Sequence, residues 1–184
     1  MNLLIDKLPT EYEGLKINTN FRSFILFELL MQERKIKMED KLMIALSYFY
    51  EEPPKDIKKA IDGILWFYTK GKKDNKKQKK GNKTKKQIYS YEHDGDYIYS
   101  AFVSQYGLDL NEIEYLHWWK FKSLFECLND ENKICQIMGY RAVDLSKIKD
   151  KETKNKYKRL KQQYALPDER TEEEKENDFA EAFW

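Results

Sequence analysis

Apolar side chains recur with helical spacing along most of this chain, and the pattern is clearest between Ile57 and Tyr68. Such spacing predicts a helix that buries one face. Pro54 suits the first turn of this helix, where its missing N–H costs nothing, and Gly71 is placed to cap the other end. The apolar positions fall at i, i+3, i+4, i+7, i+8 and i+11, and they are Ile57, Ala60, Ile61, Ile64, Leu65 and Tyr68.

Similar spacing predicts helices in most of the remaining chain. The segment 18–36 has Thr19 or Asn20 as a candidate N-cap. The segment 109–129 begins with an acid-rich first turn and is expected to form one helix of about five turns. The other expected helices occupy 39–52, the part of 87–107 that follows a short strand-like start, 131–139 ending at Gly139, and a long polar stretch, 144–166, ending before Pro167.

The first 18 residues are expected to be extended instead. The stretches "NLLIDKLP" and "EYEGLKIN" flank a polar, proline-containing turn, and Gly14 offers a second tight turn. A β element of two or three strands is expected here. The chain is therefore predicted to be mainly α, in the α+β class: a helical domain with a small N-terminal β-hairpin and a long disordered lysine-rich loop.

A lysine-rich stretch divides the chain. Residues 70–86 carry ten Lys and one Asp, so the rest of the chain carries −7 although the total charge is +2. This stretch has no aliphatic side chain to bury, which predicts a solvated loop. Neither flanking portion is large enough alone, so we expect both to pack as one domain with a long insertion, and two small lobes are the alternative. The expected parts are a β-hairpin plus helices at 1–70, a flexible linker at 71–87, a helical portion at 88–166 and an acidic tail at 167–184.

Composition narrows the class of protein. A chain of 184 residues with 15 % aromatic side chains has enough material for one hydrophobic core. No run approaches the roughly 18 apolar residues of a membrane span, and "MNLLIDKLPTEYEG" lacks the pattern of a signal peptide. Cys127 and Cys135 form no CxxC motif and are expected to be reduced thiols of a cytosolic protein.

The stretch "YEHDGDYIY", residues 91–99, contains the most enzyme-like pair, His93–Asp94. A metal site of the phosphohydrolase kind needs an earlier His, and this chain has none before His93. The preferred interpretation is a helix start, in which Asp94 accepts from free backbone N–H groups and Asp96 adds favourable charge. The alternative is a metal-dependent nuclease or phosphohydrolase centred on His93, Asp94 and His117.

The helix expected at 109–129 has aromatic residues on two faces. His117 lies near the middle of its apolar face, where a hydrogen-bonded core histidine is the ordinary case. Tyr115 and Trp119 lie one turn apart on the opposite side. This helix is either fully enclosed or uses its second aromatic stripe to meet a partner. Tyr115 and Trp119 are accordingly candidate partner-binding residues.

The charged segments suggest binding rather than catalysis. The acidic tail ends in Phe179, Phe183 and Trp184, which are further candidates for docking on a partner or a neighbouring copy. An unstructured end of the chain is the equal alternative. The lysine-rich stretch has no Arg and no interleaved aromatic residues, so it is interpreted as a spacer and nucleic-acid binding is not expected. No catalytic, cofactor or zinc motif appears, so we expect no enzyme activity, cofactor or metal.

Several blocks together resemble a family of small tail-region proteins from siphophages and prophages of Gram-positive bacteria, the bacteriophage gene-product-fifteen family. The blocks are "EHDGDYIYSAF", "YLHWWKF" and "IMGYR", supported by "LPTEYEGLKINTNFRSFILFELL" and by "WFY" before the lysine-rich stretch. The resemblance covers about residues 3–168, and none of these blocks is a catalytic signature.

The resemblance implies a role in tail assembly. Such genes typically lie between those for the major tail protein and the tape-measure protein, which is the position of tail assembly chaperones. The expected function is therefore a non-enzymatic, chaperone-like factor that binds the tape-measure protein in the cytoplasm of the bacterial host during tail morphogenesis. Other tail proteins and further copies of the chain are additional expected partners. A structural component of the mature tail is the alternative.

Overall fold

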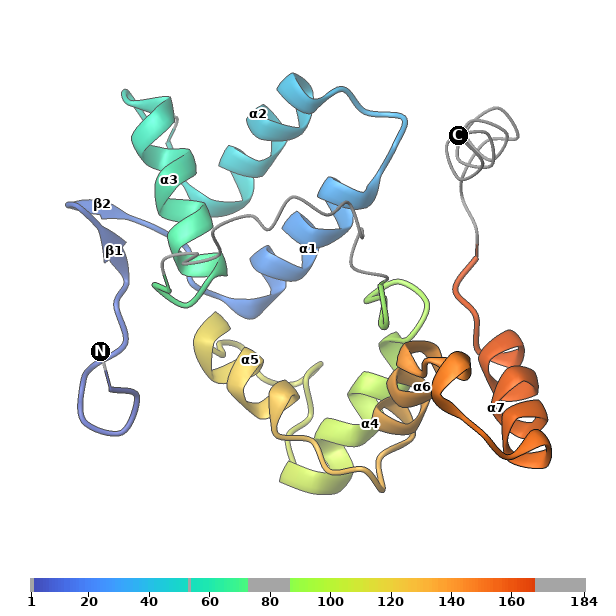
Figure 1. Ribbon diagram of the computed structural model, residues 1–184. Helices are drawn as coiled ribbons and strands as arrows, with labels where there is room; N and C mark the ends of the chain where they lie inside the picture. Colours follow the sequence, from blue (N-terminus) through green and yellow to red (C-terminus); the bar gives the residue numbers. More distant parts are fainter. Residues whose placement is uncertain (1, 53, 73–86, 168–184) are drawn as a thin grey trace.

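The structure is a computed structural model that describes residues 2–52, 54–72 and 87–167 (Figure 1). The described residues are mainly helical with one two-stranded antiparallel sheet, which confirms the predicted fold class. Most of the lysine-rich loop and nearly all of the acidic tail lie outside them. The helices are α1 (Phe21–Gln32), α2 (Met38–Phe49), α3 (Ile57–Tyr68), α4 (Gly95–Tyr106), α5 (Trp118–Glu126), α6 (Lys133–Ala142), the 3₁₀ helix η1 (Leu145–Lys147) and α7 (Lys151–Gln163).

The predicted hairpin consists of β1 (Glu11–Tyr12) and β2 (Leu15–Lys16). Glu13 and Gly14 join the strands with φ values of 47° and 81°. Positive φ at both turn residues is typical of a type I′ turn, whose twist matches that of the strands. Residues 3–5, expected to be extended, form a turn instead, because Asn2 accepts hydrogen bonds from the backbone N–H groups of residues 4, 5 and 6.

Polar side chains cap the starts of α1 and α3. The side chain of Asn20, one of the two predicted caps, accepts a hydrogen bond from the N–H of Arg22 at 3.1 Å. Asp56 accepts from the N–H of Lys59 at 3.0 Å, so α3 begins at Ile57. The prediction that Pro54 occupies the first turn of α3 is therefore wrong.

A hydrogen-bonded left-handed turn ends α3. The N–H of Lys70 donates to the carbonyl of Phe67 at 3.1 Å, and that of Gly71 donates to the carbonyl of Trp66 at 2.8 Å. This pair of bonds is the Schellman motif, with Lys70 at φ 59° and Gly71 at φ 67°. Gly71 therefore takes part in the cap as predicted. A Cβ atom at Gly71 would lie 3.2 Å from the ring of Trp66.

The predicted helix 109–129 is wrong over its first half, because α5 begins only at Trp118. The backbone before α5 pairs with the start of α1. The N–H of Trp118 donates to the carbonyl of Thr19 at 2.8 Å, and the N–H of Phe21 donates to the carbonyl of Leu116 at 2.9 Å. These tertiary bonds hold the backbone at His117 in an extended conformation that excludes a continuous helix.

Two later boundaries also differ from prediction. Helix α6 continues through Gly139 to Ala142, and the N–H of Val143 caps it by donating to the carbonyl of Gly139. Gly139 has no positive φ, so it does not end the helix as predicted. The polar segment 144–166 is divided into η1 and α7. Asp150 starts α7 by accepting a hydrogen bond from the N–H of Thr153 at 2.7 Å.

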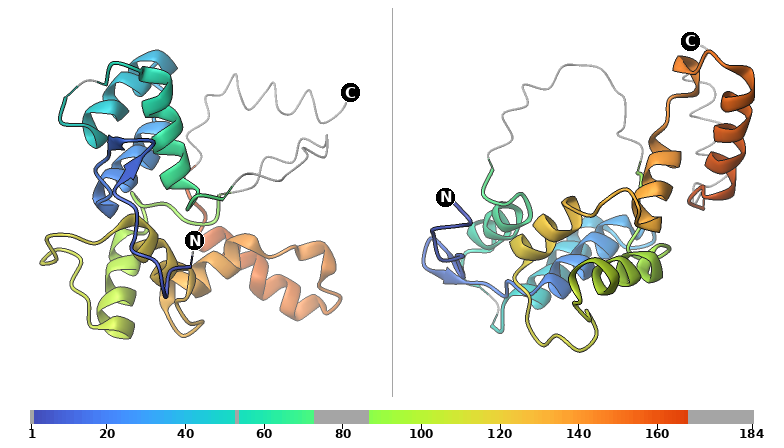
Figure 2. Two further views of the ribbon diagram at one scale, coloured as in Figure 1. Left: turned by 90° about the vertical axis from the view of Figure 1, so that its left-hand side faces the viewer. Right: turned by 90° about the horizontal axis from the view of Figure 1, so that it is seen from below.

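Aromatic rings from both sides of the lysine-rich stretch fill one core. Helix α5 contacts α1, α3 and α4 (Figure 2). The ring of Trp118 stacks on Phe24 at 5.0 Å between centroids and on Phe121 at 5.7 Å. Phe121 in turn stacks on Phe21 at 4.9 Å and on Phe102 at 5.1 Å. Helices α1 and α3 thus share a single hydrophobic cluster with α4 and α5.

Helix α7 lies at one end of the molecule, packed on α6 and η1 (Figures 1 and 2). None of its residues is buried. Among the described helices, none combines the length and the apolar character needed to cross a membrane.

Candidate functional site

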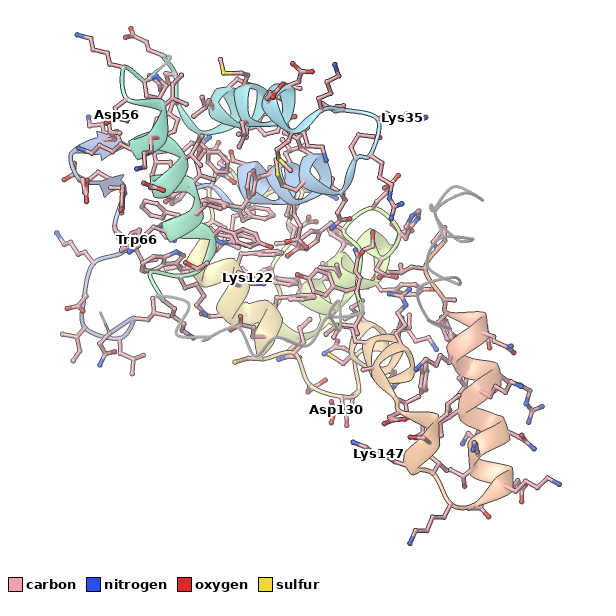
Figure 3. The ribbon with its side chains drawn as sticks, turned by 45° about the horizontal axis from the view of Figure 1, so that its top comes forward. Lys35, Asp56, Trp66, Lys122, Asp130 and Lys147 are labelled. Atoms are coloured by element: carbon pink, nitrogen blue, oxygen red, sulfur yellow. The ribbon has the colours of Figure 1, made fainter. Side chains whose placement is uncertain are left out.

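A groove of about 960 Å³ opens between three parts of the fold. One side is formed by the end of α1 and the connection to α2, where Figure 3 labels Lys35. The segment 87–93 forms the second side, and Arg141 with the end of α7 and residues 165–167 forms the third. The groove therefore includes part of the "YEHDGDYIY" stretch.

A buried ion pair lies beside this groove. Nη1 of Arg141 is 2.5 Å from Oδ2 of Asp94, and Nη2 is 2.9 Å from Oδ1, so the pair is bidentate. Asp94 is 1 % exposed and Arg141 is 7 % exposed. Asp94 does occupy the N-cap position of α4, as predicted, but its side chain makes no capping bond within the helix. It accepts from Arg141 and from the N–H of Ser90 at 2.9 Å instead, so the predicted capping role is wrong.

The guanidinium of Arg141 also binds two other segments. Its Nε donates to the carbonyl of Tyr164 at 2.5 Å, and its Nη1 donates to the carbonyl of Ile88 at 3.1 Å. Arg141 lies on the buried face of α6 with Ile134 and Ile137. One side chain therefore connects α6 with the start of α4, the segment 87–93 and the end of α7.

His117 is a buried, hydrogen-bonded histidine, as predicted, but it caps α5 rather than lying within it. Its Nδ1 accepts from the N–H of Trp119 at 3.0 Å, and its Nε2 lies 2.9 Å from the carbonyl oxygen of Pro9. An acceptor at Nδ1 and a donor at Nε2 define the neutral Nε2–H tautomer. Burial lowers the pKa of His117, which favours this neutral form.

The two tryptophans that follow His117 attach α5 to the end of α3. The indole Nε1 of Trp119 donates to the carbonyl of Phe67 at 2.7 Å, and that of Trp118 donates to the carbonyl of Tyr68 at 3.3 Å. Trp119 is 2 % exposed. Trp119 is therefore enclosed in the fold and is not exposed to a partner.

Two of the predicted partner-binding residues, Tyr115 and Trp119, do not share a surface. Tyr115 precedes α5 and is 53 % exposed, with its hydroxyl 2.7 Å from Oγ1 of Thr19. The expectation that Tyr115 and Trp119 lie on one helix face is therefore wrong, because the helix starts between them. The other three candidates lie outside the described residues: Phe179, Phe183 and Trp184.

The residues of the metal-site alternative are not arranged as a ligand set. Both carboxylate oxygens of Asp94 and both ring nitrogens of His117 are used in the hydrogen bonds given above. His93 lines the groove. Within residues 2–52, 54–72 and 87–167, no three His, Cys, Asp or Glu side chains are placed to hold a metal ion.

Sequence reasoning missed a half-buried carboxylate, Glu28. The hydroxyl of Tyr68 donates to its Oε2 at 3.1 Å. Burial raises the pKa of Glu28, and the hydrogen bond from Tyr68 and the charge of Lys122 oppose that rise. The signal in the sequence was a single acid inside the apolar run "FILFELL".

The residues that make the buried polar contacts belong to the sequence blocks that carry the family resemblance. Asp94 belongs to "EHDGDYIYSAF" and Arg141 to "IMGYR", while the "YLHWWKF" block binds carbonyls of the "WFY" block through its two indoles. These features define a helical protein whose distinctive blocks bind one another inside the fold and leave an open groove at the surface.

Comparison with known proteins identifies the family. The family model described as Bacteriophage Gp15 protein matches residues 4–166, which is most of the chain. The chain therefore belongs to this family of phage proteins. No curated protein and no solved structure matches it.

Proposed function

We propose that this phage protein is a non-enzymatic tail assembly factor that binds the tape-measure protein in the host cytoplasm while the tail forms. The observation that carries the proposal is that the buried polar side chains of this protein bind other parts of the fold. Asp94, His117 and Arg141, the buried groups best suited to chemistry, are engaged in holding the fold together. The surface presents an open groove instead, and binding in a groove is a common way for a protein to recognise a polypeptide segment.

Exposed apolar side chains support a polypeptide partner. Leu4 and Ile5 are 94 % and 81 % exposed, the highest values among the large apolar residues that are exposed in the described chain. The turn around Asn2 holds both residues in a defined backbone conformation. Adjacent exposed apolar side chains that form a contiguous patch are typical of surfaces that bind partners. The gene position implied by the family resemblance points to the tape-measure protein as that partner.

Co-expression tests the proposal. The tape-measure protein of the same phage is expected to be soluble and to co-elute with this chain on size exclusion, and to aggregate without it. The double variant Leu4→Ser/Ile5→Ser is expected to weaken the complex, whereas Lys156→Ser, on the exposed side of α7, serves as the matched control. Equal solubility of the tape-measure protein with and without this chain, and no complex, would overturn the proposal.

Mass spectrometry of purified particles separates assembly factor from tail component. An assembly factor is expected to be absent from the finished particle. A stoichiometric amount of this chain in the tail would favour the structural alternative.

A further inference from the structure

The groove between α1, segment 87–93 and the end of α7 has an excess of positive charge. Its lining contains five basic residues and two acidic residues, Glu33 and Glu92. Arg141 is neutralised by its bidentate contact with Asp94. Apart from Arg141, the lining carries four basic residues and these two acids, and the basic residues are Arg34, Lys35, Lys41 and Lys161.

Two of these lysines bind backbone carbonyls rather than carboxylates. Nζ of Lys41 donates to the carbonyl of Met31 at 2.8 Å, although Lys41 is only 6 % exposed. Nζ of Lys161 donates to the carbonyl of Val143. Neither lysine takes part in an ion pair with any described residue. An ammonium group has three donors, so each retains the capacity to bind a carboxylate.

The chain itself leads from this groove into a segment of opposite charge. Residues 165–167 line the groove. The next 17 residues, 168–184, contain eight acids and two basic residues, which gives them a net charge of −6. They also contain Phe179, Phe183 and Trp184, while Leu29, Met31 and Leu166 supply apolar surface in the groove.

We propose that residues 168–184 dock in this groove of the same chain, with their carboxylates on the groove lysines. Each residue extends the chain by at most about 3.3–3.6 Å, so the first acids, Asp168 and Glu169, reach the groove directly from Pro167. Attachment at Pro167 gives the segment a high effective concentration at this site. A partly enclosed groove also screens charges less than open solvent does.

The lysine-rich stretch is the other site in this chain that could attract the acidic residues 168–184. It carries more positive charge than the groove but has no aliphatic side chains to contact Phe179, Phe183 and Trp184. Docking of residues 168–184 in the groove is a contact within one chain and does not depend on the identity of a partner.

Carbodiimide cross-linking of the full chain, followed by mass spectrometry, tests the inference. This reagent joins lysines directly to carboxylates that contact them. Cross-links from residues 168–184 are expected at Lys35 and Lys161 and to be several-fold rarer at Lys151 and Lys156, exposed lysines of α7 outside the groove. Raising the salt from about 0.05 M to about 0.5 M is expected to reduce the groove cross-links. Equal or greater cross-linking to Lys151, Lys156 or the lysine-rich stretch would overturn the inference.

Two further arms test whether the docking occurs within one chain and whether charge drives it. In a mixture of unlabelled and ¹⁵N-labelled chains, the cross-linked products are expected to carry a single label, and products of mixed label would show docking on a second copy instead. The variant Glu172→Lys/Glu173→Lys/Glu174→Lys is expected to lose most groove cross-links. Reversal of the exposed acids Glu51 and Glu52 to Lys is the matched control and is expected to leave them unchanged. If the tail variant retained them, charge complementarity would be excluded as the cause.

Discussion

Replacement of Arg141 by Met is expected to be the most destabilising single change in the polar part of this fold. The guanidinium makes two hydrogen bonds to Asp94 and one each to the carbonyls of Tyr164 and Ile88. Met fills similar space but has no donor, so the variant leaves the Asp94 carboxylate buried and unpaired. Breaking a buried pair in this way costs about 3–5 kcal/mol. For a chain of this length that corresponds to a fall in Tm of roughly 6–20 °C.

Guanidinium chloride unfolding, followed by circular dichroism, measures this cost. The variant Arg159→Met is the control, because Arg159 is exposed on α7 and forms no ion pair with a described residue. The control is expected to unfold at the same midpoint as the original chain. A change in the slope of the transition would indicate a less compact native state rather than the loss of one interaction.

A double-mutant cycle with Asp94→Leu gives the stricter test. The double variant Arg141→Met/Asp94→Leu is expected to be more stable than Arg141→Met alone, since an apolar pair leaves no buried charge. If Arg141→Met cost less than about 1 kcal/mol, or if the two substitutions were additive, the ion pair would not be holding these segments together.

Three further predictions address other parts of the fold. Burial lowers the pKa of His117, so the unfolded chain binds the proton first as pH falls. Stability should therefore drop below about pH 6.5, by at most about 1.4 kcal/mol per pH unit, and pH-dependent unfolding of His117→Asn, which keeps a cap acceptor, should lose this component. Burial raises the pKa of Glu28, so this residue has the opposite effect on the pH dependence of stability: the folded chain binds the proton first as pH falls. Glu28→Gln should therefore raise stability at pH 7 in the same unfolding assay, and the Gln side chain can still accept the hydrogen bond from Tyr68. Gly71→Ala should lower Tm through its positive φ and its contact with a neighbouring ring, whereas Gly139→Ala, inside α6, should raise it slightly.

Local patterns in the sequence predicted the helical class and several elements. Helix α3 matches the predicted apolar spacing at both ends, since Ile57 and Tyr68 are its first and last residues. The spacing reports burial of one helix face, and α3 buries one face against the core. A β element was likewise predicted here, and the turn that forms is the second of the two predicted turns, at Gly14, which has positive φ together with Glu13.

Long-range contacts explain the failures. The start of α5 is set by backbone bonds to Thr19 and Phe21, about a hundred residues earlier, and no local feature marks them. The role of Asp94 depends on Arg141, 47 residues away. One signal was available in the sequence: Arg141 follows Ile134, Ile137 and Met138 at helical spacing, and a charge on an apolar face requires a buried partner.

These contacts also decide which substitutions can report on the groove. Arg141 lines the groove and holds four segments together, so lost binding in an Arg141 variant would not distinguish a damaged site from a damaged fold. A Lys161 variant would also affect the fold, to a smaller degree, because Lys161 binds the carbonyl of Val143. Lys35 lines the groove, is exposed, and its side chain bonds to no described residue. A change in partner binding caused by Lys35→Glu, with an unchanged unfolding midpoint, therefore reports on the groove alone.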